Sequence, residues 1–199
     1  MIRKFYFDSR EKKNEHIKSY FDRNGIEYEV RKLDVGDYMI DGNDAISIDR
    51  KASIDELSTN MMNRADHARF WREVRRAKDT GIKLIILIES NKYTDIPSLI
   101  DWKSKYSGVN GRSLIDAIYR AHISYGVEFI FCRKRATGKR IVELLQGWYV
   151  PQTLPGDPLQ RSKRDFYEYG GWCLKADWID GKITSIHKLS VDFLRTVVL

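Results

Sequence analysis

The stretch GDYMIDGNDAISIDRKASID, residues 36–55, decides how this chain is interpreted. It places an acidic residue, Asp37, in a turn, and then a second one, Asp49, followed two positions later by Lys51. If the second segment is a strand, alternation puts Asp49 and Lys51 on one face and Arg50 on the other. Two carboxylates suit Mg²⁺, and a neighbouring ammonium group suits a phosphate. The pattern therefore predicts a metal-dependent phosphodiesterase site.

Composition is that of a globular protein with an excess of positive charge. Of the 199 residues, 42% are hydrophobic and 32% charged, and 35 Lys and Arg against 28 Asp and Glu give a net charge of +7. That excess favours an anionic partner, and nucleic acid is the commonest large one. The two cysteines and four scattered histidines form no disulfide or zinc pattern.

Membrane association is not indicated by the sequence. The longest apolar run, Leu84–Ile88, is far too short to cross a bilayer. The N-terminal residues lead into a strand pattern and carry no signal-peptide hydrophobic region. We therefore expect a cytoplasmic protein with no membrane partner.

Strand and helix patterns alternate along the first three quarters of the chain. The continuous aliphatic run at 84–88 is typical of a central strand covered on both faces. A strand, a helix and a further strand, repeated twice, predict an α/β fold with a mixed central sheet flanked by helices. The predicted strands are residues 2–7, 27–33, 38–40, 45–48, 84–88 and 127–132; the predicted helices are 12–24, 54–78 with a break near Asn63, 113–125 and 138–149.

A domain boundary is predicted at residue 150. Three prolines and a glycine between residues 151 and 158 interrupt both helix and sheet patterns. Residues 1–149 then form one domain, and residues 150–199 form a linker and a small β-rich extension. Within that extension, two strand patterns over residues 172–189 flank an Asp-Gly pair, which is typical of a β-hairpin.

Asp8-Ser9-Arg10-Glu11 precedes the pattern formed by Gly36-Asp37, Asp49-Arg50-Lys51 and Asp55. With these motifs, residues 8–145 resemble the nuclease domain of the XPF-type structure-specific endonucleases, within the restriction-endonuclease-like superfamily. That family opens on Asp-x-Arg-Glu, and Asp8-Ser9-Arg10-Glu11 stands at this place. Its signature is Gly-Asp, a variable gap, Glu-Arg-Lys, three residues and Asp; Gly36-Asp37, Asp49-Arg50-Lys51 and Asp55 occupy those positions. Asp49 replaces the usual Glu, and both side chains bind Mg²⁺. The resemblance implies a restriction-endonuclease-like fold.

The resemblance also implies a catalytic group of residues. Asp37 and Asp49 would ligate Mg²⁺, for which Mn²⁺ can substitute, and Lys51 would orient or help activate the attacking water. Glu11 and Asp8 would reach the edge of the metal site from the first strand, with Glu11 as a ligand. One metal or two remains open at this stage.

Other residues of the motif and its surroundings have less defined roles. Arg50 is expected to point away from the pair or toward the DNA backbone. Asp55 would orient Lys51 or Arg50, or stabilise the N-terminus of the next helix. Exposed basic residues would contact phosphates without reading bases. Residues expected near DNA are Arg10, Arg64, Arg69, Arg72 and Arg112, with Lys103, Lys105 and Tyr106 on a loop.

The function that the sequence favours is a Mg²⁺-dependent DNA endonuclease acting on branched, flapped or forked DNA in repair, recombination or replication. The alternative is a catalytically silent DNA-binding or scaffold subunit, and an RNA-directed nuclease also stays open. Relatives commonly dimerise through late helices. A homodimer here would use Ile118, Ile141, Leu144, Leu145 and Trp148, unless these residues cover the sheet.

Overall fold

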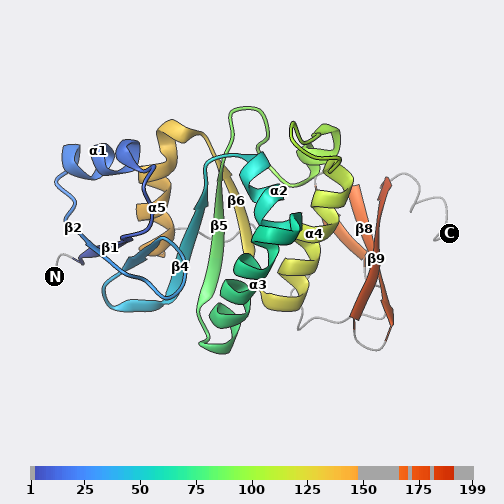
Figure 1. Ribbon diagram of the computed structural model, residues 1–199, viewed down its shortest axis with the longest axis horizontal. Coiled ribbons are helices and arrows are strands. Elements are labelled where there is room, and N and C mark those ends of the chain that lie inside the picture. Colours follow the sequence, from blue (N-terminus) through green and yellow to red (C-terminus); the bar gives the residue numbers. More distant parts are fainter. Residues whose placement is uncertain (1–2, 148–165, 170–171, 180–181, 191–199) are drawn as a thin grey trace. The chain divides into compact units, whose positions relative to one another are not determined.

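The computed structural model describes residues 3–147 and, in addition, three strands at 166–169, 172–179 and 182–190 (Figure 1). The chain divides into two units, residues 1–149 and 150–199. The first unit contains every residue of the predicted site. Among the described residues, none of the helices combines the length and apolar character needed to cross a bilayer.

The first unit is built on a mixed six-stranded sheet in the order β2-β1-β3-β4-β5-β6. The pairs β1–β2, β4–β5 and β5–β6 are parallel, whereas β1–β3 and β3–β4 are antiparallel. This arrangement confirms the mixed sheet expected from the sequence. The strands are β1 (Phe5–Asp8), β2 (Tyr28–Arg31), β3 (Tyr38–Ile40), β4 (Asn43–Lys51), β5 (Lys83–Glu89) and β6 (Glu128–Cys132).

Helices cover both faces of this sheet (Figure 1). Helices α1 and α5 pack together on one face, and α2, α3 and α4 pack together on the other. On the α1/α5 face, the Phe7 ring contacts Phe21 edge-on and is fully buried. The helices are α1 (Glu15–Arg23), α2 (Ile54–Met62), α3 (Arg64–Asp79), α4 (Gly111–Tyr125) and α5 (Thr137–Leu145), with 3₁₀ turns η1 (Pro97–Asp101) and η2 (Lys134–Ala136).

The junction between β4 and α2 follows from a capping box. Ser53 Oγ accepts a hydrogen bond from the Glu56 N–H at 3.1 Å, and Glu56 Oε2 accepts one from the Ala52 N–H at 2.9 Å. These bonds satisfy amide groups that the start of a helix leaves free. The helix begins three residues after Lys51, so it fixes the end of β4. The helix ends at Met62, and the next residue, Asn63, has an extended backbone (φ −78°, ψ 131°), which confirms the predicted break.

Strand β2 departs from the sequence-based expectation. Residues 27–33 were expected to form a half-buried strand, but β2 is shorter and only Tyr28 is partly buried. Val30 is 51% exposed because β2 lies at the edge of the sheet. Leu33, just beyond the strand, is the buried residue of this segment.

The late helices cover the sheet and do not present the expected dimer surface. Ile118, Ile141, Leu144 and Leu145 are each at most 2% exposed within one chain. A dimer therefore needs other contacts, since these side chains already belong to the core. Trp148, the fifth residue of that expectation, lies outside the described residues.

The second unit contains a three-stranded antiparallel sheet in the order β7-β8-β9. Its strands are β7 (Phe166–Tyr169), β8 (Trp172–Ile179) and β9 (Lys182–Ser190). Strands β8 and β9 coincide with the two strand patterns predicted from the sequence. The Asp-Gly pair between them lies outside the described residues.

Candidate active site

Alternation along β4 brings Asp49 and Lys51 together on the face covered by α2, α3 and α4. They are in register with Ile86 and Ile88 of β5. The Lys51 ammonium contacts Asp49 Oδ1 at 2.7 Å, and the two residues are only 6% and 4% exposed. The predicted pair is thus a buried ion pair close to the C-terminal end of β4.

Asp37 joins this pair through the backbone of β4. Its N–H donates to Ile48 O at 2.7 Å, and its Oδ2 accepts from the Arg50 N–H at 2.8 Å. The preceding Gly36 has φ +69°, and a Cβ there would lie 2.8 Å from Ile48 O and collide with Ser47 Oγ. Only glycine fits this approach, so the Gly-Asp sequence is what brings the carboxylate against β4.

The charges at the site are strongly coupled. Burial, followed by the negative charge of Asp49, raises the pKa of Asp37 well above its ordinary value. Burial opposes a charge on Lys51, but Asp49 and Asp37 outweigh that effect and raise its pKa. Two acidic groups held next to each other favour a bound cation, because the cation relieves their repulsion.

The donor set suits Mg²⁺ in an open site. Asp49 Oδ2 is buried and has no hydrogen-bond partner among the described residues. Within that same part of the chain, no three His, Cys, Asp or Glu side chains form a ready-made metal cage. Mg²⁺ does not require one, since proteins commonly hold it by one or two carboxylates together with water and substrate phosphate.

Arg50 lies on the opposite face, as alternation predicts, and enters a buried polar network. Its Nη1 contacts Glu89 Oε2 at 3.1 Å, and its Nη2 contacts Glu11 Oε1 at 3.2 Å. Glu89 Oε1 also accepts hydrogen bonds from Thr137 Oγ1 at 2.8 Å and lies 2.6 Å from His16 Nε2. The arrangement favours a structural role for Arg50, and it engages Glu11 Oε1 with Arg50. The role of Glu11 as a metal ligand stays a prediction.

Asp8 is likewise occupied by local contacts. Its Oδ1 accepts from the N–H and Nε of Arg10, and its Oδ2 accepts from Arg10 Nη2 and from the Leu33 N–H, all within 2.6–2.8 Å. Although burial opposes its charge, the bonds from Arg10 lower the pKa of Asp8. Asp8 therefore fastens the segment after β2 to the end of β1. The same bonds engage most of the Arg10 guanidinium.

Asp55 lies where one of the two sequence-based alternatives placed it, at the start of the next helix, and it has a second role that neither alternative contained. It lies in the first turn of α2, where its charge suits the helix N-terminus. Its Oδ1 also accepts from Ser104 Oγ at 3.3 Å and from the Lys105 N–H at 3.1 Å. The last acidic residue of the motif thus anchors the loop before α4.

Two acidic residues near the site were missed from the sequence. Glu73 of α3 accepts from the Gly36 N–H at 2.7 Å, and burial followed by the charge of Asp49 raises its pKa. A signal existed, because Glu73 is three residues from buried Phe70 and four from buried Ala77, on the inward side of a basic helix. Glu89 likewise ends a strand whose other central residues are all apolar.

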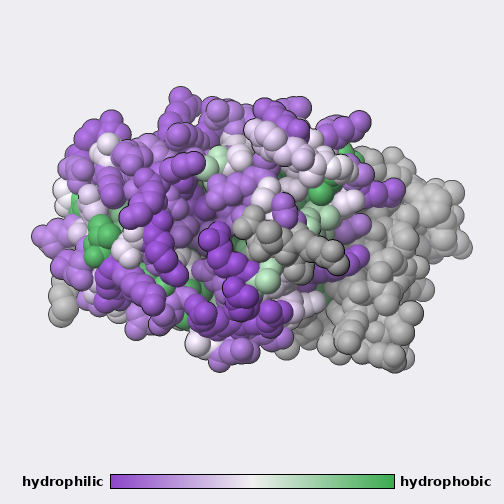
Figure 2. Space-filling model, viewed as in Figure 1, coloured by the Kyte–Doolittle hydropathy of each residue, from purple (hydrophilic) through white to green (hydrophobic). Residues whose placement is uncertain are grey.

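Basic side chains are exposed on α3 and at the start of α4. Arg69 and Arg72 are exposed on α3, and Arg112 is exposed at the start of α4. Figure 2 shows hydrophilic side chains gathered over the C-terminal part of α3. The side chain of Arg64 lies outside the described residues. Phe70 is buried in the core.

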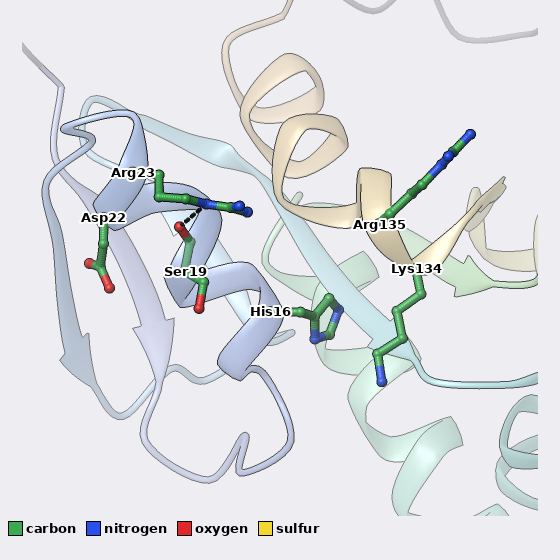
Figure 3. Close-up of a pocket in the computed structure, with 6 residues that line it drawn as sticks. All are labelled: His16, Ser19, Asp22, Arg23, Lys134 and Arg135. Carbon is green, nitrogen blue, oxygen red and sulfur yellow. Dashed lines mark hydrogen bonds between the residues drawn. The ribbon is translucent and has the colours of Figure 1, made fainter.

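A separate hollow lies between α1 and η2 and contains none of the three residues of the predicted site (Figure 3). Its volume is about 650 Å³, and Arg23 Nε donates to Ser19 O at its wall. Its lining includes three Lys and Arg side chains and one carboxylate, so the hollow adds positive charge to the neighbourhood of His16. The lining residues are His16, Ser19, Asp22, Arg23, Lys134 and Arg135.

Two solved structures are similar to this chain in fold. XPF from Aeropyrum pernix superimposes with a TM-score of 0.56 at 20% sequence identity, covering 73% of this chain and 64% of that one. XPF from Aeropyrum pernix in complex with DNA gives a TM-score of 0.55 at 21% identity, with the same coverage of 73% and 64%. This chain thus spans somewhat less than two thirds of those proteins. No curated protein sequence matches it.

The family comparison agrees with the architecture. Residues 7–145 match the ERCC4 domain, and this range contains the Gly-Asp turn, β4 and all helices of the first unit. The resemblance to XPF-type nuclease domains seen in the sequence is confirmed by the family match and the fold. The chain belongs to the ERCC4 domain family.

Proposed function

We propose that this chain is a Mg²⁺-dependent endonuclease that hydrolyses phosphodiester bonds in branched, flapped or forked DNA. The observation that carries the proposal is the buried Asp49–Lys51 pair at 2.7 Å. Asp49 Oδ2 has no hydrogen-bond partner among the described residues, and the Asp37 carboxylate accepts a hydrogen bond from the Arg50 N–H. Membership in the ERCC4 domain family supports the reaction class, and the Aeropyrum pernix XPF complex supports DNA as the substrate.

Asp37 and Asp49 would hold the metal ion. When bound, Mg²⁺ supplies a Lewis acid for a phosphoryl oxygen and makes a water molecule a better nucleophile. The Asp49 oxygen that faces Lys51 keeps the ammonium in place, while the other oxygen is free to bind. One carboxylate therefore performs two tasks at the site.

Lys51 contributes a fixed positive charge. Its ammonium has three N–H donors, of which the contact with Asp49 engages one. The others can donate to the attacking water or to the phosphate oxygen on which negative charge develops. A donor fixed in a buried site stabilises that charge more than a mobile one in water.

Glu73 and Arg50 fix the position of Asp37 through hydrogen bonds. Glu73 accepts from the Gly36 N–H and so fixes the turn that carries Asp37. The backbone N–H of Arg50 fixes Asp37 Oδ2, while the Arg50 side chain is held on the far face by Glu89. We assign both as positioning residues.

The test is a cleavage assay on linear, flapped, forked and four-way DNA with Mg²⁺, Mn²⁺ or EDTA. The wild type is expected to cut branched DNA only with metal, and Asp49→Asn or Asp37→Asn is expected to lower the rate by at least roughly 100-fold. Glu29→Gln, which removes one partner of an exposed ion pair on β2, is the matched control. Cleavage that survives EDTA or Asp49→Asn would contradict the proposal.

The same assay separates the alternatives. Tight binding of branched DNA with no cleavage under any metal favours a scaffold subunit. A faster reaction with RNA of the same sequence and shape favours an RNA-directed enzyme. Equal rates on linear and branched DNA remove the structure specificity but leave the metal-dependent chemistry.

A further inference from the structure

A tyrosine stands in solvent on the loop between η1 and α4. Tyr106 is 84% exposed, whereas the other exposed large hydrophobic residues of the described chain, Val30 and Ile100, reach 51% and 39%. Aromatic side chains bury a large area when they find a partner, so one held almost fully in water is unusual. The mechanism proposed above does not use it.

The loop that carries Tyr106 is an ordered hairpin. Lys103 pairs with Asn110 as an antiparallel bridge, and the Ser104 N–H donates to Val109 O at 2.9 Å. Ser104 Oγ accepts from the Tyr106 N–H at 3.2 Å, which fixes the backbone at the tyrosine itself. At the base, Gly111 packs so closely on the Leu99 carbonyl that a Cβ would collide with it. The exposure of the ring is therefore built into the fold.

The loop is attached to the segment that carries the candidate catalytic lysine. Asp55 holds it through Ser104 Oγ and the Lys105 N–H. Asp55 lies four positions after Lys51, so their Cα atoms lie at most roughly 14 Å apart. This distance corresponds to about four nucleotide steps at ~3.4 Å per step along one strand. A nucleic acid bound at Lys51 is thus within reach of the loop.

The chemistry of the loop fits a nucleic acid. Lys103, Lys105 and Arg112 are all exposed around Tyr106, while Asp101 is the exposed acidic residue beside them. Positive charges track a phosphate backbone, and an aromatic ring stacks on a base of any sequence. A ring can stack only where the face of a base is open, which occurs at unpaired nucleotides and at duplex ends. A base pair inside a continuous duplex offers no such face.

We propose that Tyr106 is a stacking platform for an unpaired or terminal base of DNA next to the cleavage site, with Lys103 and Lys105 on the adjoining phosphates. The inference rests on DNA being the substrate proposed above. It gives the chain a means of preferring branched over continuous DNA without reading sequence. Asp55 connects the stacking site to the catalytic site, because it lies in the first turn of α2, directly after the strand that carries Lys51, and bonds to the loop that carries Tyr106.

The test measures binding in EDTA, so that it does not depend on hydrolysis. Fluorescence anisotropy compares a flapped DNA with a blunt duplex of equal length, for the wild type, Tyr106→Ala, Tyr106→Leu and Tyr106→Phe. Loss of one base–aromatic stack is expected to weaken flap binding roughly 5- to 100-fold in Tyr106→Ala and Tyr106→Leu. Tyr106→Phe keeps the ring and should bind like the wild type. Blunt-duplex affinity should change much less than flap affinity in every variant, because only the two terminal base pairs of the duplex offer an open face.

Lys105→Ala is the matched control on the same loop. It should weaken binding to both DNAs equally and reduce the slope of log K against log salt by about one. An unchanged melting temperature shows that the variants fold, since Tyr106 has few contacts to lose. Equal loss on flap and duplex, no loss in Tyr106→Ala, or full retention in Tyr106→Leu would overturn the inference. A wild type that binds flaps through Tyr106 but never cuts would instead contradict the catalytic proposal alone.

Discussion

Replacing Glu89 by Gln tests whether the arginine of the Asp-Arg-Lys motif is part of the scaffold. Arg50 and Glu89 are 4% and 5% exposed, and Arg50 Nη1 lies 3.1 Å from Glu89 Oε2. At that separation and an effective dielectric constant of about 20, the attraction is about 5 kcal/mol. Desolvation offsets part of it, but Glu89→Gln leaves the buried Arg50 with Glu11 as its remaining acidic partner, and breaking a buried ion pair typically costs about 3–5 kcal/mol.

The expected result is a large loss of stability. For a domain of this size, a loss of about 3–5 kcal/mol lowers the melting temperature by roughly 6–20 °C. Thermal unfolding followed by circular dichroism at neutral pH measures the shift. Glu29→Gln is the control, because the Lys4–Glu29 pair is nearly half exposed on both sides and should change the melting temperature by less than about 2 °C.

A double variant tests whether the loss of stability comes from the broken ion pair. Arg50→Met with Glu89→Met removes both buried charges, so it should recover more than half of the stability lost in Glu89→Gln. A melting temperature of Glu89→Gln within about 2 °C of the wild type would refute the buried network. A double variant less stable than the single one would show that Arg50 stabilises the fold through Glu11 and the Lys13 carbonyl instead.

Three further predictions concern single positions. Gly36→Ala should lower the free energy of unfolding by about 2–4 kcal/mol, because φ is +69° and the new Cβ would collide with Ser47 and Ile48. Chemical denaturation measures this free energy, and a change below about 0.5 kcal/mol would contradict the turn geometry. Glu73→Ala should lower the cleavage rate more than Glu73→Gln, since Gln keeps an acceptor for the Gly36 N–H; equal rates in the two variants would remove the positioning role. Burial lowers the pKa of His122. As pH falls, His122 is therefore protonated in the unfolded chain before it is protonated in the folded protein, and the free energy of unfolding should decrease below about pH 6.5. His122→Gln should flatten this part of the stability–pH curve, and an unchanged curve would contradict the buried, neutral state of His122.

The sequence predicted most of the fold because its patterns are local and strong. The apolar run Leu84–Ile88 lies inside β5, at the centre of the parallel part of the sheet. The break at Asn63 was likewise predicted from adjacent residues. Strand β2 was not predicted well, because whether a strand lies at an edge depends on pairing between segments distant in sequence.

The site was predictable in part for a similar reason. Asp49, Lys51 and Arg50 separate onto two faces by simple alternation, which needs no tertiary information. The contacts of Asp8 and Glu11 depend on which cation lies nearest in space, and in both cases it is an arginine. Spacing along the chain does not reveal such partners, and the same holds for the distance between Glu73 and Gly36.

The role of Asp55 shows how a motif residue can acquire a tertiary function. Its spacing from Lys51 suggested a partner within the motif, but its hydrogen bonds reach a loop about fifty positions later in the chain. The sequence already suggested Lys103, Lys105 and Tyr106 as a loop near DNA, and the exposure of Tyr106 in the structure is what supports its proposed role in binding. Sequence alone offered a basic segment with an aromatic residue, a pattern shared by many exposed loops.

The most direct test of the central claim is the single-turnover rate of cleavage by Lys51→Met on one flapped DNA with Mn²⁺. Lys83→Met is the matched control, since Lys83 forms a surface ion pair with Glu128 at the other end of β5. The account predicts a rate at least roughly 100-fold below wild type for Lys51→Met, with unchanged DNA affinity in EDTA and a wild-type rate for Lys83→Met. A Lys51→Met rate within about threefold of wild type would contradict it.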